Sequence, residues 1–186
     1  DSFLRKGVFD MKKGILKSYM VIVVLAVLFH AGNGYGQFVQ GAAAPVFSLK
    51  DTKGQNYDLS KMQDQPLTIL YFFAADSRPS QEGLLSLNDL VRSNPAAKLQ
   101  VWAVSASSPE KIRQFAAQTG LSFPLLIDKG SVSDLYKARM VLPTVCIVGP
   151  GLQVLDYFQG GGKTTEAMLT RLAERELQRR QTLTAK

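Results

Sequence analysis

The stretch that decides the fold reads Leu67-Thr-Ile-Leu-Tyr-Phe-Phe73, a run of branched and aromatic residues without polar alternation. A strand with this pattern is buried on both faces, as in a sheet that helices cover on either side. The sequence therefore predicts a central strand over 67–73 of an α/β protein.

Strand and helix patterns alternate on both sides of this central strand. Ahead of it, two short β-rich runs around the turn Asp51-Thr-Lys-Gly54 predict a hairpin. After it, one helix has Ser108 as its expected N-cap and Gly120 as its end. The order predicts a central mixed sheet flanked by helices, with the hairpin as an N-terminal extension. We expect strands over 46–49, 56–59, 99–105, 123–127, 144–148 and 153–159, and helices over 80–92, 109–119, 131–137 and 165–180.

The composition limits the chemistry that the chain can carry. A single cysteine excludes an intramolecular disulfide and a cysteine-based metal cluster. The single histidine, His30, lies in a segment that we expect to be removed, so the mature protein would lack histidine catalysis and histidine metal ligation. We expect no metal and no cofactor. The net charge of +7 is not gathered in a basic run with interleaved aromatic residues, so we expect no nucleic-acid partner.

The N-terminal residues have the pattern of an export signal. Lysines follow Met11, an apolar stretch over 20–29 comes next, and Gly34 and Gly36 precede the expected cleavage before Gln37. The apolar stretch is shorter than the about 20 residues that a transmembrane helix needs. We therefore predict a protein of the bacterial periplasm or the extracellular space, with no stable membrane span after cleavage. An uncleaved N-terminal membrane anchor is the alternative.

The domain organisation follows from these features. We expect upstream translation or a fragment edge over 1–10, a signal peptide over 11–36, a linker over 37–43, an α/β domain over 44–180 and a C-terminal tail over 181–186.

The α/β domain resembles the TlpA-like redoxin branch of the thioredoxin superfamily, of the AhpC/TSA type. The order and spacing of several short motifs together carry this resemblance, which covers about residues 44–180 and implies a thioredoxin-like fold. The motifs are Ala44-Pro-Val-Phe-Ser-Leu49, Gly54, Leu59-Ser60, Phe72-Phe-Ala74, Phe123-Pro-Leu-Leu-Ile-Asp128 and Leu142-Pro-Thr144.

The resemblance implies a Cys-X-X-Cys motif at the start of a helix, where the helix dipole and end amides lower the pKa of the first thiol. The matching positions here are Ser77-Arg78-Pro79-Ser80. A serine hydroxyl is a far weaker nucleophile than a thiolate and cannot exchange disulfides. Asp76 also replaces the aromatic residue that usually precedes the first cysteine, and Leu142 replaces the usual glycine before the later proline. We therefore predict no dithiol redox activity at this motif.

Peroxiredoxins are the nearest alternative within the superfamily. Their Thr-X-X-Cys motif would fall on Ser77 and Ser80, and the essential thiol is again missing. Pro143, before Thr144, resembles the cis-proline of thioredoxins, where exposed backbone pairs with a bound peptide. A peroxiredoxin would more often have arginine there.

Two functions of different class remain. The first is a redox-inactive module that binds an extended peptide or protein in a groove. The second is a thiol-disulfide oxidoreductase or peroxiredoxin-like antioxidant enzyme that acts through Cys146 or a partner's thiols. Purely structural roles are the alternative for three of these residues. Asp76 and Ser77 would be helix caps, and Cys146 would be a small buried hydrophobe. The groove residues would be Asp76, Ser77, Ser80, Leu142, Pro143 and Thr144.

Overall fold

The computed structural model describes residues 39–65, 67–93, 95, 99–160, 168, 171, 172, 175 and 182. The segments expected over 1–10 and 11–36 lie outside the described residues. So do most of the helix expected over 165–180 and most of the tail, although Met168, Leu172 and Arg175 are described and helical. Within the described part of the chain, no helix is both long and apolar enough to cross a membrane.

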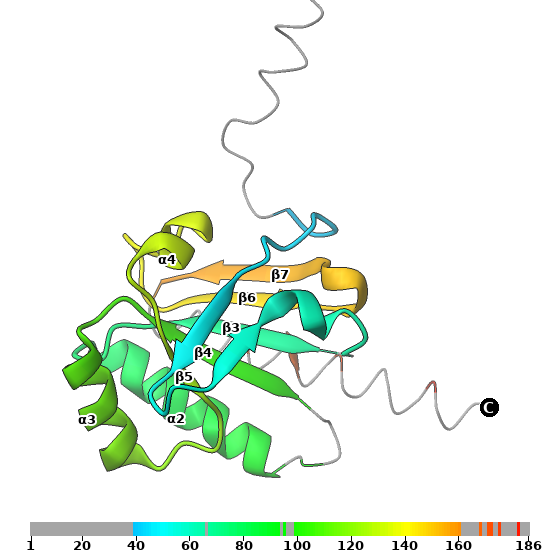
Figure 1. Ribbon diagram of the computed structural model, residues 1–186. Helices are drawn as coiled ribbons and strands as arrows, with labels where there is room; N and C mark the ends of the chain where they lie inside the picture. Colours follow the sequence, from blue (N-terminus) through cyan, green and yellow to red (C-terminus); the bar gives the residue numbers. More distant parts are fainter. Residues whose placement is uncertain are drawn as a thin grey trace, which may run out of the picture. The chain divides into compact units, whose positions relative to one another are not determined.

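Seven strands form one mixed sheet in the order β2-β1-β5-β4-β3-β6-β7, as Figure 1 shows. The central strand β3 is parallel to β4, β4 is parallel to β5, and the other neighbours are antiparallel. The sheet and its N-terminal hairpin confirm the predicted α/β architecture. The strands are β1 Ser48–Asp51, β2 Asn56–Asp58, β3 Thr68–Phe72, β4 Gln100–Ser105, β5 Leu125–Ile127, β6 Thr144–Val148 and β7 Val154–Gln159.

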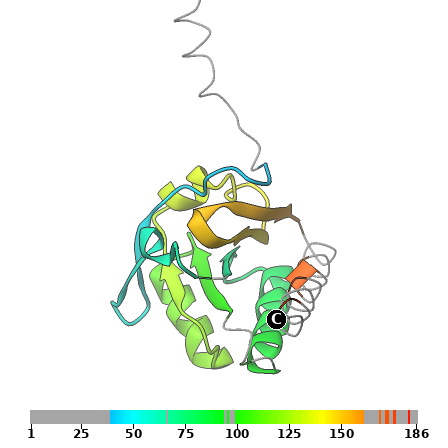
Figure 2. The same cartoon turned by 90° about the vertical axis from the view of Figure 1, so that its right-hand side faces the viewer.

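Helices lie on both faces of the sheet. α2 (Arg78–Ser93) and α3 (Pro109–Thr119) cover one face, whereas α4 (Ser131–Leu135) lies over the other (Figures 1 and 2). Two 3₁₀ turns, Leu59–Met62 and Pro150–Leu152, complete the regular structure of the described residues.

The side chains of β3 alternate between two hydrophobic clusters. Ile69 and Tyr71 pack in the cluster of α2 and α3, whereas Leu70 and Phe72 pack in the cluster of α4. All four are fully buried, and burial of each large apolar side chain contributes about 1.5–3 kcal/mol. The continuous apolar run of the sequence is therefore a strand covered on both faces, as predicted.

Three elements begin two residues away from the predicted position. β1 begins at Ser48 rather than at 46, although the carbonyl of Phe47 still accepts a hydrogen bond from the amide of Leu59 at 2.9 Å. The ring of Phe47 packs edge-on against the rings of Trp102 and Tyr136. β5 begins at Leu125 rather than at 123. α2 begins at Arg78 rather than at 80, because the carbonyl of the preceding residue already accepts the first helical hydrogen bond.

Candidate functional site

Ser77 occupies the N-cap position of α2, in the turn that follows β3. Its carbonyl accepts a hydrogen bond from the backbone amide of Gln81 at 3.0 Å, and its own amide donates to the carbonyl of Ala74 at 3.1 Å. Its hydroxyl makes no hydrogen bond to any described residue, although the side chain is only half-buried. Ser77 thus occupies a helix-cap position, as its structural role predicts, but its side chain makes no capping hydrogen bond to a described residue. The hydroxyl is thus available to a ligand.

Ser80 lies one turn further into α2 and is fully buried. Its Oγ lies 3.4 Å from the backbone amide of Ala74 and accepts a long hydrogen bond from it. Its carbonyl accepts a hydrogen bond from the hydroxyl of Tyr71 at 3.3 Å. The two serines of the motif therefore have different environments, one open at the helix end and one enclosed beneath it.

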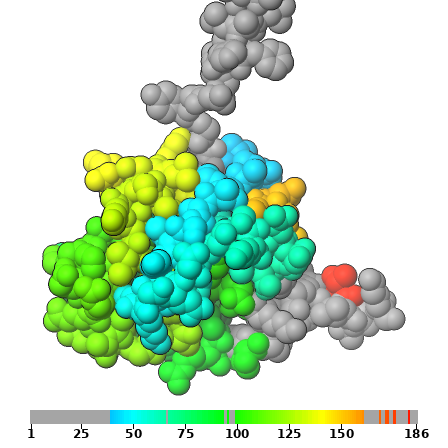
Figure 3. Space-filling view, viewed as in Figure 1, coloured from blue at the N-terminus to red at the C-terminus, as the bar shows by residue number. Residues whose placement is uncertain are grey.

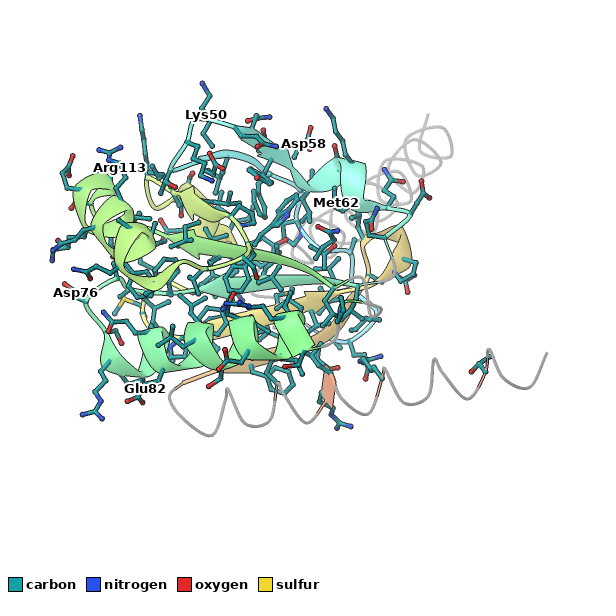
Figure 4. All side chains as sticks on the ribbon, turned by 90° about the horizontal axis from the view of Figure 1, so that it is seen from below. Lys50, Asp58, Met62, Asp76, Glu82 and Arg113 are labelled. Carbon is teal, nitrogen blue, oxygen red and sulfur yellow. The ribbon has the colours of Figure 1, made fainter. Side chains whose placement is uncertain are left out.

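Asp76 points from the same turn toward α3 rather than along α2. Its Oδ2 lies 2.7 Å from the ammonium of Lys111, and Figure 4 places Asp76 between the beginning of α2 and α3. The hydrogen bond from Lys111, a backbone hydrogen bond and the positive charge of Lys111 hold the pKa of this carboxyl below its usual value. The aspartate at the position where the resemblance implies an aromatic residue thus forms a surface ion pair.

The peptide bond between Leu142 and Pro143 is cis, as the resemblance implies. The antiparallel register pairs Thr144 with Phe72, which brings this loop to the end of β3, next to the motif. Pro143 and Thr144 are buried, and the carbonyl of Pro143 accepts a hydrogen bond from the amide of Gly160 at 3.0 Å. Neither the amide nor the carbonyl of Leu142 is hydrogen-bonded to a described residue.

A cleft of about 210 Å³ lies between this loop and the end of β3. Of the six predicted groove residues, Leu142 lines the cleft, whereas Ser80, Pro143 and Thr144 lie buried and Asp76 and Ser77 lie outside the lining. Ser107, which sequence reasoning missed, both lines the cleft and accepts a hydrogen bond from the amide of Ala75 at 3.1 Å. Ser107 and Ala75 are 32 residues apart in the sequence, so no local sequence pattern could predict that Ser107 belongs to the site. The lining comprises Phe73, Ala74, Ala106, Ser107, Ser133, Ala138, Arg139 and Leu142.

Apolar side chains are exposed beside the cleft. Met140 and Val141, between two lining residues, are 91% and 40% exposed, and Leu135 at the end of α4 is 48% exposed. Figure 3 shows α4 and the residues after it as a yellow projection on the surface. We call Leu135, Met140 and Val141 the apolar rim. Next to the apolar rim, Arg139 forms an ion pair with Asp134 at 2.7 Å, so these two residues add little net charge to the surface beside it.

Cys146 lies in β6 and is fully buried. Its neighbours across the sheet are Leu70 and Tyr157. Burial raises the pKa of the thiol to about 12, whereas reactive cysteines have a lowered pKa and solvent access. The thiol therefore packs as a small hydrophobe, and the exposure that a one-cysteine redox centre requires is absent.

The described residues contain no group of three or more His, Cys, Asp or Glu side chains placed to hold a metal ion.

Comparisons with known proteins agree with this architecture. The sequence model of the AhpC/TSA family matches residues 40–156, a range that includes the motif, the cis-proline and Cys146. The thiol-disulfide oxidoreductase ResA of Halalkalibacterium halodurans is 29% identical over 136 residues, which are 72% of this chain and 75% of ResA. The chloroplastic peroxiredoxin Q of Sedum lineare is 31% identical over 98 residues, about half of either protein (52%).

Solved structures show the same fold. DsbE from Chlorobium tepidum superposes with a TM-score of 0.65 at 25% identity, over 76% of this chain and 99% of DsbE. The predicted thioredoxin-like fold is therefore confirmed.

Proposed function

Because the chain belongs to the AhpC/TSA family, a redoxin family of the thioredoxin superfamily, we propose that it keeps the family's fold without the family's sulfur chemistry. In this proposal the protein is a redox-inactive module that binds an extended peptide or protein segment at the cleft beside Leu142. Relatives of the chain are thiol-disulfide oxidoreductases and peroxiredoxins, so the proposed function departs from theirs at the motif itself.

The observation that carries the proposal is the loss of sulfur at both motif positions. Ser77 and Ser80 stand where the family's thiols would attack and resolve a disulfide, and serine can do neither. The remaining thiol, Cys146, is buried in β6 with a raised pKa, so it cannot replace them without local opening of the sheet.

The chemistry of the cleft supports peptide binding. An extended peptide needs backbone partners, and Leu142 lines the cleft with a backbone amide and carbonyl that no described residue occupies. The apolar rim gives such a peptide side-chain contacts, because Met140 and Val141 are exposed apolar side chains and methionine is flexible. Ser77 lies outside the lining, so the proposed peptide would reach its free hydroxyl only by extending beyond the cleft to the N-terminus of α2.

The charged groups around the cleft favour a ligand segment of low charge. Arg139 is paired with Asp134, and Lys111 is paired with Asp76, both at 2.7 Å. Because the charges of each pair cancel locally, we expect neither an acidic nor a basic segment to bind much more tightly than an uncharged one.

The second candidate is a thiol enzyme of the kind that the relatives are, acting through Cys146 or through a partner's thiols. Only the family relationship favours it. We also propose export through the segment over 11–36, on the strength of its basic start, apolar core and small residues.

A disulfide-reduction assay tests redox inactivity. The purified chain, a Ser77→Cys/Ser80→Cys variant and a Cys146→Ala variant are each incubated with a disulfide-bonded test protein and dithiothreitol. We expect no catalysis above background from the wild type and clear catalysis from the double-cysteine variant. Catalysis by the wild type that the Cys146→Ala change abolishes would replace this proposal with a one-cysteine enzyme.

A separate assay tests binding. The ligand is a fluorescently labelled test protein, unfolded by reduction and carboxymethylation, whose anisotropy reports its capture by the chain. Met140→Asp should weaken binding about tenfold, because it places a charge in the apolar rim. Leu85→Asp is the matched control, since Leu85 is exposed on α2 away from the cleft, and it should change the affinity by less than twofold. Equal affinities of the two variants would contradict the cleft as the binding site.

A further inference from the structure

A second and larger cleft, of about 610 Å³, lies between the β1–β2 hairpin, the residues that follow β5, and α3. It shares no lining residue with the cleft beside Leu142. Figure 3 shows the cyan hairpin next to green α3 on the face toward the viewer. We call this hollow the hairpin cleft.

Three basic side chains line the hairpin cleft, each from a different element. Lys50 comes from β1, Arg113 from α3, and Lys129 from the loop after β5. Figure 4 shows Lys50 and Arg113 extending into solvent from the same side of the molecule. Cations from three elements that line one hollow attract an anionic ligand to it, because their electric fields add.

The positive charge of the hairpin cleft is poorly neutralised. Within the described part of the chain, Lys50 and Lys129 form no ion pair. Arg113 contacts Glu110 at 3.2 Å on the surface of α3, and such an exposed pair contributes little free energy and yields readily to a competing anion. The cleft therefore carries cations that a ligand can reach.

Asp51 is the acidic residue among the described residues of the lining, and its carboxylate is already hydrogen-bonded within the hairpin turn. Its side chain is buried, and Oδ1 accepts hydrogen bonds from the amides of Lys53 and Gln55 at 2.8 and 2.9 Å. Those bonds hold the carboxylate in the hairpin turn. The surface that a ligand would meet is thus positive despite this acid.

Neutral groups of the lining suit the same kind of ligand. Asn56 accepts a hydrogen bond from the hydroxyl of Ser48 at 3.0 Å through Oδ1, which leaves its amide nitrogen as a donor. No aromatic side chain lines the cleft among the described residues, so nothing there would stack on a nucleobase. The volume exceeds the space that one phosphate fills and lies within the range of small-molecule sites.

We propose that the hairpin cleft binds a small non-aromatic anion that carries two or more phosphate or carboxylate groups, held by Lys50, Arg113 and Lys129. Spaced anionic groups match three cations that come from three elements, and each pairing is a charge-assisted hydrogen bond.

Calorimetric titration of the full chain at low ionic strength tests this site, with inorganic tripolyphosphate and citrate as separate probes. We expect at least one of them to bind with 1:1 stoichiometry and more tightly than orthophosphate or acetate. If only tripolyphosphate binds, the cleft is a phosphate site. If only citrate binds, it is a carboxylate site. The absence of 1:1 binding by both probes would overturn the proposal.

Charge-removing variants locate the site. We expect each of three substitutions to lower the affinity for the tighter-binding probe about 5- to 10-fold, because each removes one charge-assisted contact. The substitutions are Lys50→Gln, Arg113→Gln and Lys129→Gln. Lys61→Gln removes the same charge from an exposed lysine outside the cleft and should change the affinity by less than twofold. Equal weakening by Lys61→Gln would show attraction to the net charge alone and would overturn the site. Thermal melts of each variant without probe verify that all are folded.

Discussion

The ammonium of Lys111 on α3 lies 2.7 Å from the carboxylate of Asp76, across 35 residues of sequence. This ion pair ties the turn between β3 and α2 to the neighbouring helix. Both side chains are more than half exposed, so solvent screens the pair and its contribution to stability is small. Its main effect is to neutralise the charge of Asp76 next to the motif, at a position where the resemblance implies an aromatic residue.

Replacement of Lys111 by methionine should raise the pKa of Asp76 toward its usual value. Lys111 donates the hydrogen bond that lowers this pKa most, and its charge adds to the effect. Because the pKa in the folded state lies below that of the unfolded chain, the pair stabilises the fold above the unfolded-state pKa. The contribution is lost as the pH falls through the folded-state pKa.

NMR titration of the Asp76 carboxyl carbon measures this pKa directly. Arg113→Met is the matched control, because Arg113 is an exposed cation on the same helix that pairs with Glu110 instead. An Asp76 pKa that responds equally to both substitutions contradicts the assignment to Lys111.

The two serines of the motif should respond differently to truncation. Ser80→Ala removes a buried hydroxyl that accepts a hydrogen bond from the amide of Ala74, so we expect a loss of about 1 kcal/mol in the free energy of unfolding. Ser77→Ala removes a hydroxyl without a partner among the described residues, so we expect a change below about 0.5 kcal/mol. Urea denaturation compares the two. A larger loss for Ser77→Ala would mean that its hydroxyl caps α2 in solution.

Elements with strong local signals could be predicted from the sequence. The helix over 109–119 has its expected bounds because Ser108 accepts a hydrogen bond from the amide of Lys111 and Gly120 adopts a left-handed φ of 57°. β6 also has its expected bounds, since its five residues are apolar or β-branched and buried throughout. In these cases the residues that set the ends lie within the element or next to it.

Features that depend on contacts between distant segments could not be predicted. The ring of Phe47, next to the start of β1, packs against Trp102 and Tyr136, which are distant in the sequence. The lining of the cleft beside Leu142 comes from the turn after β3, the loop after β4, α4 and the loop that follows α4, and only one predicted groove residue belongs to it. The side chain of Asp76 turns to Lys111 rather than to its own helix. Local patterns carry no information on such partners.

Cys146 should resist modification in the folded protein. Burial raises the pKa of its thiol to about 12, so little thiolate is present at pH 8, and no path from solvent reaches it in β6. We expect labelling by Ellman's reagent to be slow in buffer and complete within minutes in guanidinium chloride. Rapid stoichiometric labelling without denaturant would refute the buried placement and would support the one-cysteine enzyme.

Asp128 should be more important for the stability of the fold than an exposed acidic residue such as Asp134, near the cleft beside Leu142. It is 3% exposed, Oδ2 accepts a hydrogen bond from the amide of Ser133 at 2.7 Å, and Oδ1 accepts one from the amide of Val132 at 3.2 Å. Asp128→Ala leaves both buried amides without these acceptors, so we expect a loss of about 2–3 kcal/mol in the free energy of unfolding. Asp134→Ala is the control, because Asp134 forms an exposed ion pair whose loss costs less than about 1 kcal/mol.

Asp128→Ala should also weaken the peptide binding that we propose. α4 has five residues, too few to hold a helical conformation without external contacts, so it depends on Asp128 for its first turn. Its last residue, Leu135, belongs to the apolar rim. Asp128→Asn keeps one acceptor oxygen and should fall between the wild type and Asp128→Ala in both urea midpoint and anisotropy. If Asp128→Ala lowers the urea midpoint but leaves binding intact, α4 does not position the rim, and the peptide contacts only the loop over 140–142.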